Sequence, residues 1–512
     1  MSERTAAVEM RNITKSFGTV LANDHVNLSI YRGEILALLG ENGSGKTTLM
    51  NMLSGIYFPD SGSIFIDGKE ASIASPREAF EYGIGMIHQH FKLVDVMTAT
   101  ENIILGLKEG RTLNLGAAEE KIRGICEAYG FEIDPRQKIY DMSVSQKQTV
   151  EIIKVLYRGA DILILDEPTA VLTPQETDKL FAVLRNMRND GKAIVIITHK
   201  MHEVEELRDR VAVLRRGTYV GDLITKETNA QEMTNMMVGR AVSLNIDRPD
   251  PVDPKDRLIV ENISARSEDG ILKLDRVSFT VRTGEILGIA GISGSGQKEL
   301  LEAIAGLYPM ESGSIVYIND DGTRTELVGK DPLDISALGV ALSFVPEDRL
   351  GMGLIGSMNI TDNMMLRSYR TGFGMFMDHK RPQKTAEKIV NDLEVVTPGY
   401  TTPVKRLSGG NVQKVLVGRE ISSTPTVLMT AYAVRGLDIN SSYTIYHLLN
   451  EQKKKGVAII SVGDDLAVLL ELCDRILVLC GGKVSGIVEG KNAEKHEIGM
   501  MMTKIGGDET NE

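Results

Sequence analysis

Apolar residues in this chain follow two recurring patterns. Short continuous runs, such as Ala193 to Ile197, are typical of buried strands, and longer stretches with helical spacing, such as Gln175 to Arg188, are typical of amphipathic helices. The two patterns alternate, which predicts an α/β fold. No apolar run approaches the roughly 20 residues that a membrane-spanning helix needs. The start, Met1 to Arg4, leads into a mixed polar strand rather than a signal peptide, so we expect a soluble or peripheral protein.

One long pattern occurs twice. The stretch that begins at Tyr31 (YRGEILALLGENGSGKTTLMNMLSGIYFPDSGSI) returns at Val281 (VRTGEILGIAGISGSGQKELLEAIAGLYPMESGSI), with equivalent glycines 251 residues apart (291 − 40). A repeat of this length indicates a tandem duplication. Between the two copies, the segment Asp247 to Arg257 combines three prolines with alternating charge, which is typical of a short, stiff linker. We therefore expect a first domain at 1–246, a linker at 247–257 and a second domain at 258–512.

Charge and cysteine content narrow the function classes. The 512 residues include 58 Lys plus Arg and 70 Asp plus Glu, which gives a net charge of −12. This acidic balance argues against a general nucleic-acid binder. The cysteines, Cys126, Cys473 and Cys480, lack the spacing of a metal site and are too few for a disulfide framework, which fits a reducing compartment.

The segment GENGSGKTT has the composition of a phosphate-binding turn. It follows the apolar run Glu34 to Leu39, precedes a helix-like stretch and has the spacing G-x-x-x-x-G-K-T. Its glycines let successive backbone N–H groups converge on one anion at the positive end of the helix. Lys46 would reach the outer phosphates, and the Thr47 hydroxyl would bind a phosphate-bound magnesium ion. The segment predicts a nucleoside triphosphate site formed by Gly40, Glu41, Asn42, Gly43, Ser44, Gly45, Lys46, Thr47 and Thr48.

Two strand ends supply candidate catalytic groups. The apolar run Asp161 to Leu165 is followed by Asp166, which could hold magnesium through water, and Glu167, which could polarise the attacking water. The run Ala193 to Thr198 leads to His199, which could bind the γ-phosphate and orient that water. A plain acidic strand end and a structural histidine are the alternatives, and the phosphate-binding turn upstream favours the catalytic interpretation.

Phe17 is a candidate for contact with a nucleotide base. It lies 29 residues before Lys46 (46 − 17), on a hairpin-like segment. Stacking of an aromatic ring on a base contributes about 1–3 kcal/mol. An ordinary turn phenylalanine that packs on the sheet is an equally compatible interpretation.

Together these motifs resemble those of the ATP-binding-cassette ATPases. The phosphate loop and the strand followed by Asp166 and Glu167 resemble segments of that family, and His199 resembles its switch histidine. Gln89 in HQHF is similar to its Q-loop glutamine. The segment Met142 to Gln146 resembles a variant signature motif, and Leu407 to Asn411 (LSGGN) resembles a well-kept one. Two cassettes in one chain are most similar to the importers of simple sugars and nucleosides, and HQHF favours the nucleoside branch.

The resemblance implies a specific architecture. We expect two tandem P-loop NTPase domains of the ATP-binding-cassette type, each with a mostly parallel sheet core, an antiparallel β subdomain and a helical subdomain. It also implies a head-to-tail pairing in which the phosphate loop of one cassette faces the signature of the other. The first site would then bind ATP and Mg²⁺, with Ser408, Gly409 and Gly410 from the second unit completing it and Gln89 joining Thr47 and Asp166 around the metal.

The second unit departs from the motifs of the first. Gln297 replaces the phosphate-loop lysine, Lys298 the hydroxyl, and Glu347 the Q-loop glutamine. The acidic pair and the histidine are replaced by Ala431, Tyr432 and Asp464. Without these groups a phosphate loop cannot stabilise the transferring phosphoryl group, so we expect one consensus site and one degenerate site.

The resemblance implies an energy-coupling ATPase that works with two membrane-spanning permease subunits and, through them, an extracytoplasmic solute-binding protein. Its place would be the cytoplasmic face of the cell membrane, as a peripheral protein, with no nucleic-acid partner. A soluble twin-cassette translation factor that acts on ribosomes is the alternative from another class. That class usually has two working sites and a basic surface, whereas this chain is acidic.

Overall fold

The structure is a computed structural model that describes residues 6–18, 20–88, 91–107, 114–169, 172–198, 200–207, 209–239, 246–292, 294–369 and 378–503. The chain divides into two compact units, Met1–Ser243 and Leu244–Glu512. Residues of the proline-rich segment are bonded to the second unit: the Arg248 guanidinium donates hydrogen bonds to the carbonyls of Leu470 and Cys473, each at 2.7 Å. Its last two residues already belong to a strand, β11 (Asp256–Arg266).

The first unit contains two sheets. An antiparallel sheet has the order β2-β1-β4-β5, and a six-stranded sheet has the order β10-β9-β3-β8-β7-β6, in which only β10 is antiparallel to its neighbour. The strand bounds are β1 Ala6–Phe17, β2 Val20–Tyr31, β3 Ile35–Leu39, β4 Ser61–Ile66, β5 Lys69–Ala71, β6 Ile84–Ile87, β7 Ile162–Asp166, β8 Ala193–Ile197, β9 Arg210–Arg215 and β10 Thr218–Ile224.

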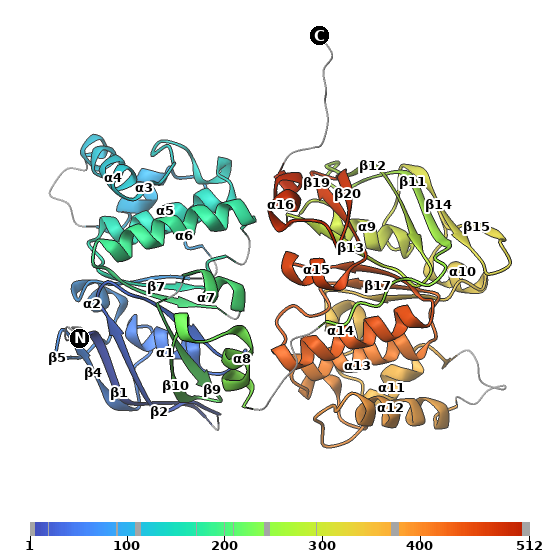
Figure 1. The fold of residues 1–512 in the computed structure, drawn as a ribbon, viewed down its shortest axis with the longest axis horizontal. Helices are drawn as coiled ribbons and strands as arrows, with labels where there is room; N and C mark the ends of the chain where they lie inside the picture. The colour runs from blue at the N-terminus through green and yellow to red at the C-terminus, as the bar shows by residue number, and fades with distance from the viewer. Residues whose placement is uncertain are drawn as a thin grey trace, which may run out of the picture. The chain divides into compact units, whose positions relative to one another are not determined.

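Some helices of the first unit form a separate subdomain, and others cover the sheet. Helices α3, α4 and α5 gather at one end of the unit, opposite strands β1, β2 and β4 (Figure 1), and pack around their own apolar cluster. The bounds are α1 Lys46–Leu53, α2 Pro76–Glu81, α3 Ala99–Ile104, α4 Leu115–Tyr129, α5 Val144–Tyr157, α6 Pro174–Asn189, α7 Met201–Leu207 and α8 Ala230–Val238. Thr173 caps α6 with a reciprocal hydrogen-bond pair to Glu176, which explains why the helix begins there.

The second unit repeats this plan. Its sheets have the orders β12-β11-β14-β15 and β16-β17-β18-β13-β19-β20. The remaining strand bounds are β12 Leu272–Arg282, β13 Ile286–Gly291, β14 Ser312–Ile318, β15 Arg324–Glu326, β16 Leu342–Val345, β17 Val427–Ala431, β18 Ala458–Val462, β19 Arg475–Cys480 and β20 Lys483–Glu489. The helices are α9 Gln297–Ile304, α10 Pro332–Ala337, α11 Ile360–Met365, α12 Lys380–Asp392, α13 Gly409–Ser422, α14 Ile439–Lys454, α15 Leu466–Leu472 and α16 Lys495–Thr503. The predicted fold class is confirmed.

Both units use the same buried polar contacts to fix the start of the central strand. In the first unit, Asp209 Oδ2 accepts the Ile35 N–H at 2.8 Å, and Arg210 pairs with the buried Glu34 at 2.7 Å. In the second unit, Asp474 Oδ2 accepts the Ile286 N–H at 2.8 Å, and the equivalent arginine and glutamate are Arg475 and Glu285. A buried charge is retained where it is paired and hydrogen-bonded. These contacts therefore belong to the scaffold that both units share.

Candidate functional site

The phosphate loop of the first unit joins β3 to α1. Gly40, Gly43 and Gly45 have φ angles of 156°, 80° and 96°, in the region that favours glycine. A Cβ on Gly45 would overlap the carbonyl oxygen of Ala22, and one on Gly40 would overlap that of Leu214. Sterics thus require glycine at the first and last of these positions, and the loop leads directly into the first turn of α1.

Two side chains of this loop are suited to an anion. Lys46 is 7% exposed, and its Nζ donates to the carbonyls of Gly40 and Glu41 at 2.7 and 2.9 Å. Burial lowers the pKa of Lys46, and the carboxylates of Glu167 and Asp166 oppose this effect. The buried hydroxyl of Ser44 has no hydrogen-bond partner among the described residues. A phosphate group would supply the acceptors that both donors need.

Thr47 and Asp166 meet at the end of β7. The Thr47 hydroxyl donates to Asp166 Oδ2 at 3.3 Å. Burial, and then the neighbouring Glu167 carboxylate, raise the pKa of Asp166, whereas Thr47 and Lys46 lower it. A hydroxyl and a carboxylate are the oxygen donors that Mg²⁺ prefers, and a divalent cation would favour the ionised carboxylate that burial disfavours. These two residues therefore fit a phosphate-bound magnesium ion.

Glu167 has an unusual backbone conformation. Its φ is 48°, which is uncommon for a residue other than glycine, and its N–H donates to the Ile197 carbonyl on β8 at 2.9 Å. Tyr432 has the equivalent place in the second unit, with a φ of 51° and an N–H that donates to Val462 at 3.0 Å. The second unit keeps the strained turn although it lacks the carboxylate.

Phe17 lies at the end of β1 with 44% of its surface exposed. The ring of Tyr57 meets it edge to face, with 5.1 Å between ring centroids, and Lys15 Nζ lies 5.7 Å from the Phe17 centroid. An exposed ring that is held from the side is available for stacking. Gln89 and His199, the two other predicted contacts of the γ-phosphate and metal, lie outside the described residues.

The second phosphate loop has the shape of the first and different chemistry. Gln297 is 3% exposed, and its Nε2 donates to the Ile292 carbonyl at 3.1 Å, as Lys46 does to Glu41. Lys298, at the hydroxyl position, points its ammonium to Glu302 at 3.7 Å. Burial, with Asp464 nearby, raises the pKa of Tyr432 to about 12, so its hydroxyl stays protonated at neutral pH and is not a general base.

The chain matches the family model described as "ABC transporter" twice, over residues 23–170 and 274–430, which together make up more than half of its length. The chain belongs to the ABC transporter family. This confirms the resemblance inferred from the motifs. As an ABC protein it binds ATP and hydrolyses it.

Curated relatives of this ABC protein match it over nearly their whole length. The nucleoside import ATP-binding protein NupA of Lactococcus lactis subsp. cremoris is 41% identical over 507 residues, 98% of each chain. The guanosine import ATP-binding protein NupO of Bacillus subtilis is 40% identical over 97% of each chain. The glucose import ATP-binding protein TsgD13 of Haloferax volcanii is 39% identical, over 99% of this chain and 97% of that protein.

Among solved structures, a chain in the crystal structure of the complex of archaeal ribosomal stalk protein aP1 and archaeal ribosome recycling factor aABCE1 matches with a TM-score of 0.61. It is 15% identical, and the match covers 93% of this chain and 90% of that chain. At this identity the likeness shows the twin-cassette fold alone.

Each of the two segments that resemble an ABC signature contains the serine that caps a helix. Ser408 Oγ accepts the Asn411 N–H at the start of α13, and Ser143 Oγ accepts the Gln146 N–H at the start of α5. Gly409 and Gly410 form the first turn of α13, so their N–H groups lie at the positive end of a 14-residue helix. Ser145, which replaces a signature glycine, lies in the first turn of α5, with its Oγ 3.1 Å from that of Ser143.

Sequence reasoning missed an ion-pair cluster around Arg435 in the second cassette. The Arg435 guanidinium pairs with Glu347 at 2.6 Å and with Asp464 at 3.3 Å, and lies 5.5 Å from the ring centroid of Tyr432. Glu347, Asp464 and Tyr432 occupy the positions predicted from the motifs for the Q-loop glutamine, the switch histidine and the catalytic carboxylate. The only sequence signal was that two of the three replacements are acidic, which indicates a nearby cation.

Proposed function

We propose that the chain is the ATP-binding and hydrolysing subunit of a membrane importer that takes up a nucleoside or a simple sugar. Relatives that are 39–41% identical over nearly their whole length carry the names of import ATP-binding proteins for a nucleoside, guanosine and glucose. The proposed hydrolysis rests on one observation: Lys46 and Thr47, which follow β3, lie close to Asp166 and Glu167 at the end of β7.

In this proposal only the first cassette carries out hydrolysis. Lys46 and the loop N–H groups bind the phosphates, Thr47, Asp166 and Gln89 hold Mg²⁺, Glu167 polarises the attacking water, and His199 orients it. Magnesium, when bound, neutralises charge on the transferring phosphoryl group. Phe17 stacks on the adenine ring.

The second cassette supplies a signature rather than a catalytic centre. Ser408, Gly409 and Gly410 would bring the positive end of α13 to the γ-phosphate held by the first phosphate loop, and the variant signature at Ser145 would face the degenerate loop. Its own phosphate loop has Gln297 in place of the lysine, and after β17 it has Tyr432, protonated at neutral pH, in place of the carboxylate. This gives one consensus composite site and one degenerate site.

Transport requires partners that cross the membrane. Among the described residues, no helix is both long and apolar enough to span a bilayer. We infer that the chain docks from the cytoplasmic side, as a peripheral subunit, on two permease subunits that receive solute from an extracytoplasmic binding protein. The segment 90–96, of which His90 lies outside the described residues, is the proposed docking surface. It is tied to α5, because Glu151 accepts the Lys92 N–H at 2.6 Å and Lys154 Nζ donates to the Lys92 carbonyl at 3.1 Å.

The variant Glu167→Gln tests the catalytic assignment. It should abolish steady-state hydrolysis and leave ATP binding intact, because the change removes the base and spares the phosphate contacts. The matched variant Tyr432→Phe should keep wild-type turnover. Both are measured as ATPase rate and nucleotide affinity of the purified full chain; wild-type turnover in Glu167→Gln, or a large loss in Tyr432→Phe, contradicts the assignment.

A further inference from the structure

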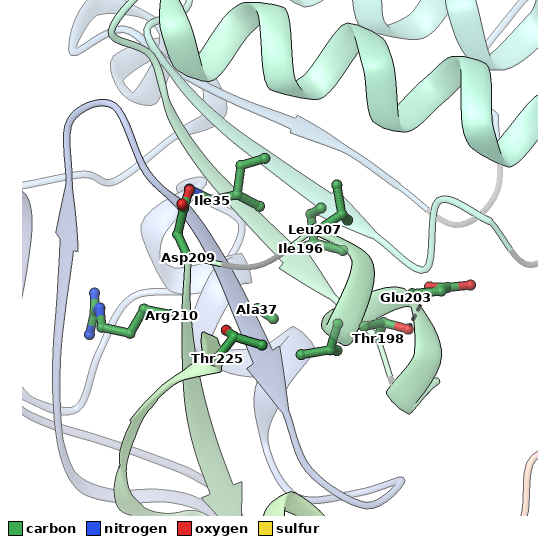
Figure 2. Close-up of a pocket in the computed structure, with 10 residues that line it drawn as sticks. Ile35, Ala37, Ile196, Thr198, Glu203, Leu207, Asp209, Arg210 and Thr225 are labelled. Atoms are coloured by element: carbon green, nitrogen blue, oxygen red, sulfur yellow. Dashed lines mark hydrogen bonds between the residues drawn. The ribbon is translucent and has the colours of Figure 1, made fainter. Parts of the chain in front are cut away.

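Glu203 on α7 has a buried carboxylate that bonds to two loops of the first cassette. Glu203 is 2% exposed and lines a small pocket between α7 and the central strands (Figure 2). Its Oε1 accepts a hydrogen bond from the Thr169 hydroxyl, and its Oε2 accepts one from the Thr198 hydroxyl at 2.9 Å, drawn as a dashed line in Figure 2. Lys200 Nζ lies 3.3 Å from Oε1.

These partners lie on the two loops that carry the proposed catalytic residues. Thr169 is two residues after Glu167, and Thr198 and Lys200 flank His199 in the sequence. Lys200 adds two further links, because its Nζ donates to the Thr169 carbonyl at 3.3 Å and its backbone N–H donates to the Thr198 hydroxyl at 3.1 Å. One carboxylate thus ties the loop after β7 to the loop after β8.

The second cassette provides an internal comparison. In the later part of each cassette, a residue of the second cassette is equivalent to the residue 265 positions earlier in the first. Asp474 and Asp209 show this by their matching contacts, and so do Tyr432 and Glu167. At this offset, Thr169, Thr198 and Glu203 correspond to Val434, Gly463 and Val468. The second unit therefore keeps the scaffold contacts and lacks every side chain of this cluster.

The comparison separates folding from catalysis. Burying a carboxylate carries a desolvation penalty that its hydrogen bonds must offset. The second unit forms the same strained turn and the same strands with apolar residues, so the fold does not require the carboxylate. The cluster is absent from the cassette in which the catalytic side chains are also absent.

We propose that Glu203 is a positioning residue for hydrolysis: it holds the loops of Glu167 and His199 in one arrangement without touching nucleotide. The inference rests on the proposed function, because it assumes that those two residues act on the γ-phosphate. A displacement of about 1 Å in a catalytic group can lower turnover by about 10²-fold. Loss of the carboxylate should therefore lower kcat and spare nucleotide binding, which the phosphate loop provides.

The first test is Glu203→Gln in the purified full chain. The amide keeps the volume but has no charge and one acceptor oxygen, so Lys200 loses its ion pair and only one of the two threonine hydroxyls keeps its acceptor. We expect kcat to fall about 10- to 100-fold with KM and ATP affinity within twofold of wild type, and vanadate-trapped ADP to fall with kcat. The control is Glu206→Gln, the same change at an exposed position of the same helix, which should leave all four quantities unchanged.

A second variant carries the residues of the second unit, Thr169→Val, Thr198→Gly and Glu203→Val together. This set is compatible with the fold because the second cassette contains it, so it should fold, bind ATP and show the same loss of kcat. If both variants keep the wild-type kcat while Glu167→Gln is inactive, the positioning role of Glu203 is wrong and the catalytic assignment of Glu167 stands. Parallel loss of nucleotide binding and turnover, or loss of the folded cassette in both variants, would overturn it in favour of a folding role. Turnover in Glu167→Gln would instead refute the catalytic assignment.

Discussion

The two cassettes join equivalent pairs of loops with different side chains. In the first, the buried Glu203 accepts hydrogen bonds from Thr169 and Thr198 and so joins the loops after β7 and β8. In the second, Arg435 joins the equivalent loops through Asp464 on the exposed side, and also pairs with Glu347. The positions that would contact a γ-phosphate in the first cassette are thus engaged in ion pairs in the second.

This difference shows that the shape of a cassette does not depend on the side chains proposed for catalysis. The strained turn at Tyr432, the contacts of Asp474 and the glycine conformation at Gly296 all persist. What differs between the cassettes are the side chains that the proposed mechanism assigns to phosphate, metal or water. The second cassette therefore keeps the shape of the first without the side chains that the proposed mechanism uses to stabilise a transferring phosphoryl group.

The largest expected effect tests the pairing of the two cassettes. Gly410→Asp should lower ATP hydrolysis by about 10²–10³-fold, because it would displace a donor of the γ-phosphate and add negative charge beside it. Ser145→Asp, the matched change in the other signature, should cost less than about tenfold, because in the proposed pairing it would face a phosphate loop that lacks a lysine. The measurement is the ATPase rate of each variant in the assembled transporter.

The structure adds a control to this experiment. A Cβ on Gly410 would lie 3.1 Å from Ser441 Oγ and 3.3 Å from Asp438 Oδ2, so an aspartate there also meets a carboxylate of its own cassette. Gly410→Asn has nearly the same volume and no charge, and it separates crowding within the cassette from repulsion of phosphate. Equal losses at Gly410 and Ser145, or a greater loss at Ser145, would show that the proposed pairing is wrong.

The next effect comes from exchanging the phosphate-loop residues between the cassettes. Lys46→Gln should lower hydrolysis about 100-fold, because the glutamine would still bond to the loop carbonyls, as Gln297 does, but would bring no charge to the phosphates. The reverse change, Gln297→Lys, should leave hydrolysis unchanged, since Ala431 and Tyr432 still offer no metal ligand or base. Activity gained in Gln297→Lys, measured with Lys46→Gln as background, would mean that the second site is competent.

Local patterns in the sequence predicted much of the fold and of the first site. The buried strand at Ala193–Ile197 has the bounds of β8, and the helix expected at 175–188 lies within α6 (Pro174–Asn189). The phosphate loop and the acidic pair were found because their spacing is short and their residue types are unusual. The roles of His199 and Gln89 stay predictions, because these residues lie outside the described part of the chain.

The two clusters that tie the loops together could not be predicted in this way. Arg435 and Glu347 are 88 residues apart (435 − 347), and no local pattern brings them together. Glu203 is one of several acidic residues in the short helix MHEVEEL, and only tertiary packing decides which of them points inward. Alignment of the two halves at an offset of 265 residues carries the missing signal, because it places Val468 against Glu203.

The smallest expected effect concerns the Arg435 cluster. The side chains of Arg435, Glu347 and Asp464 are 53%, 41% and 42% exposed, and exposed ion pairs contribute only about 0–1 kcal/mol each. A double-mutant cycle of Arg435→Ala and Asp464→Asn should therefore give a coupling energy of about 0.2–1 kcal/mol.

Hydrogen exchange offers a second measurement, because the backbone N–H groups of Tyr432, Arg435 and Leu437 donate hydrogen bonds in this loop. The single variants should speed exchange of these amides up to about fivefold, and 1 M salt should remove most of the effect. A coupling energy above about 3 kcal/mol, or a coupling energy that salt leaves unchanged, would mean that the cluster behaves as a buried ion pair. In that case the stability of the second cassette, as well as the arrangement of its loops, would depend on Arg435.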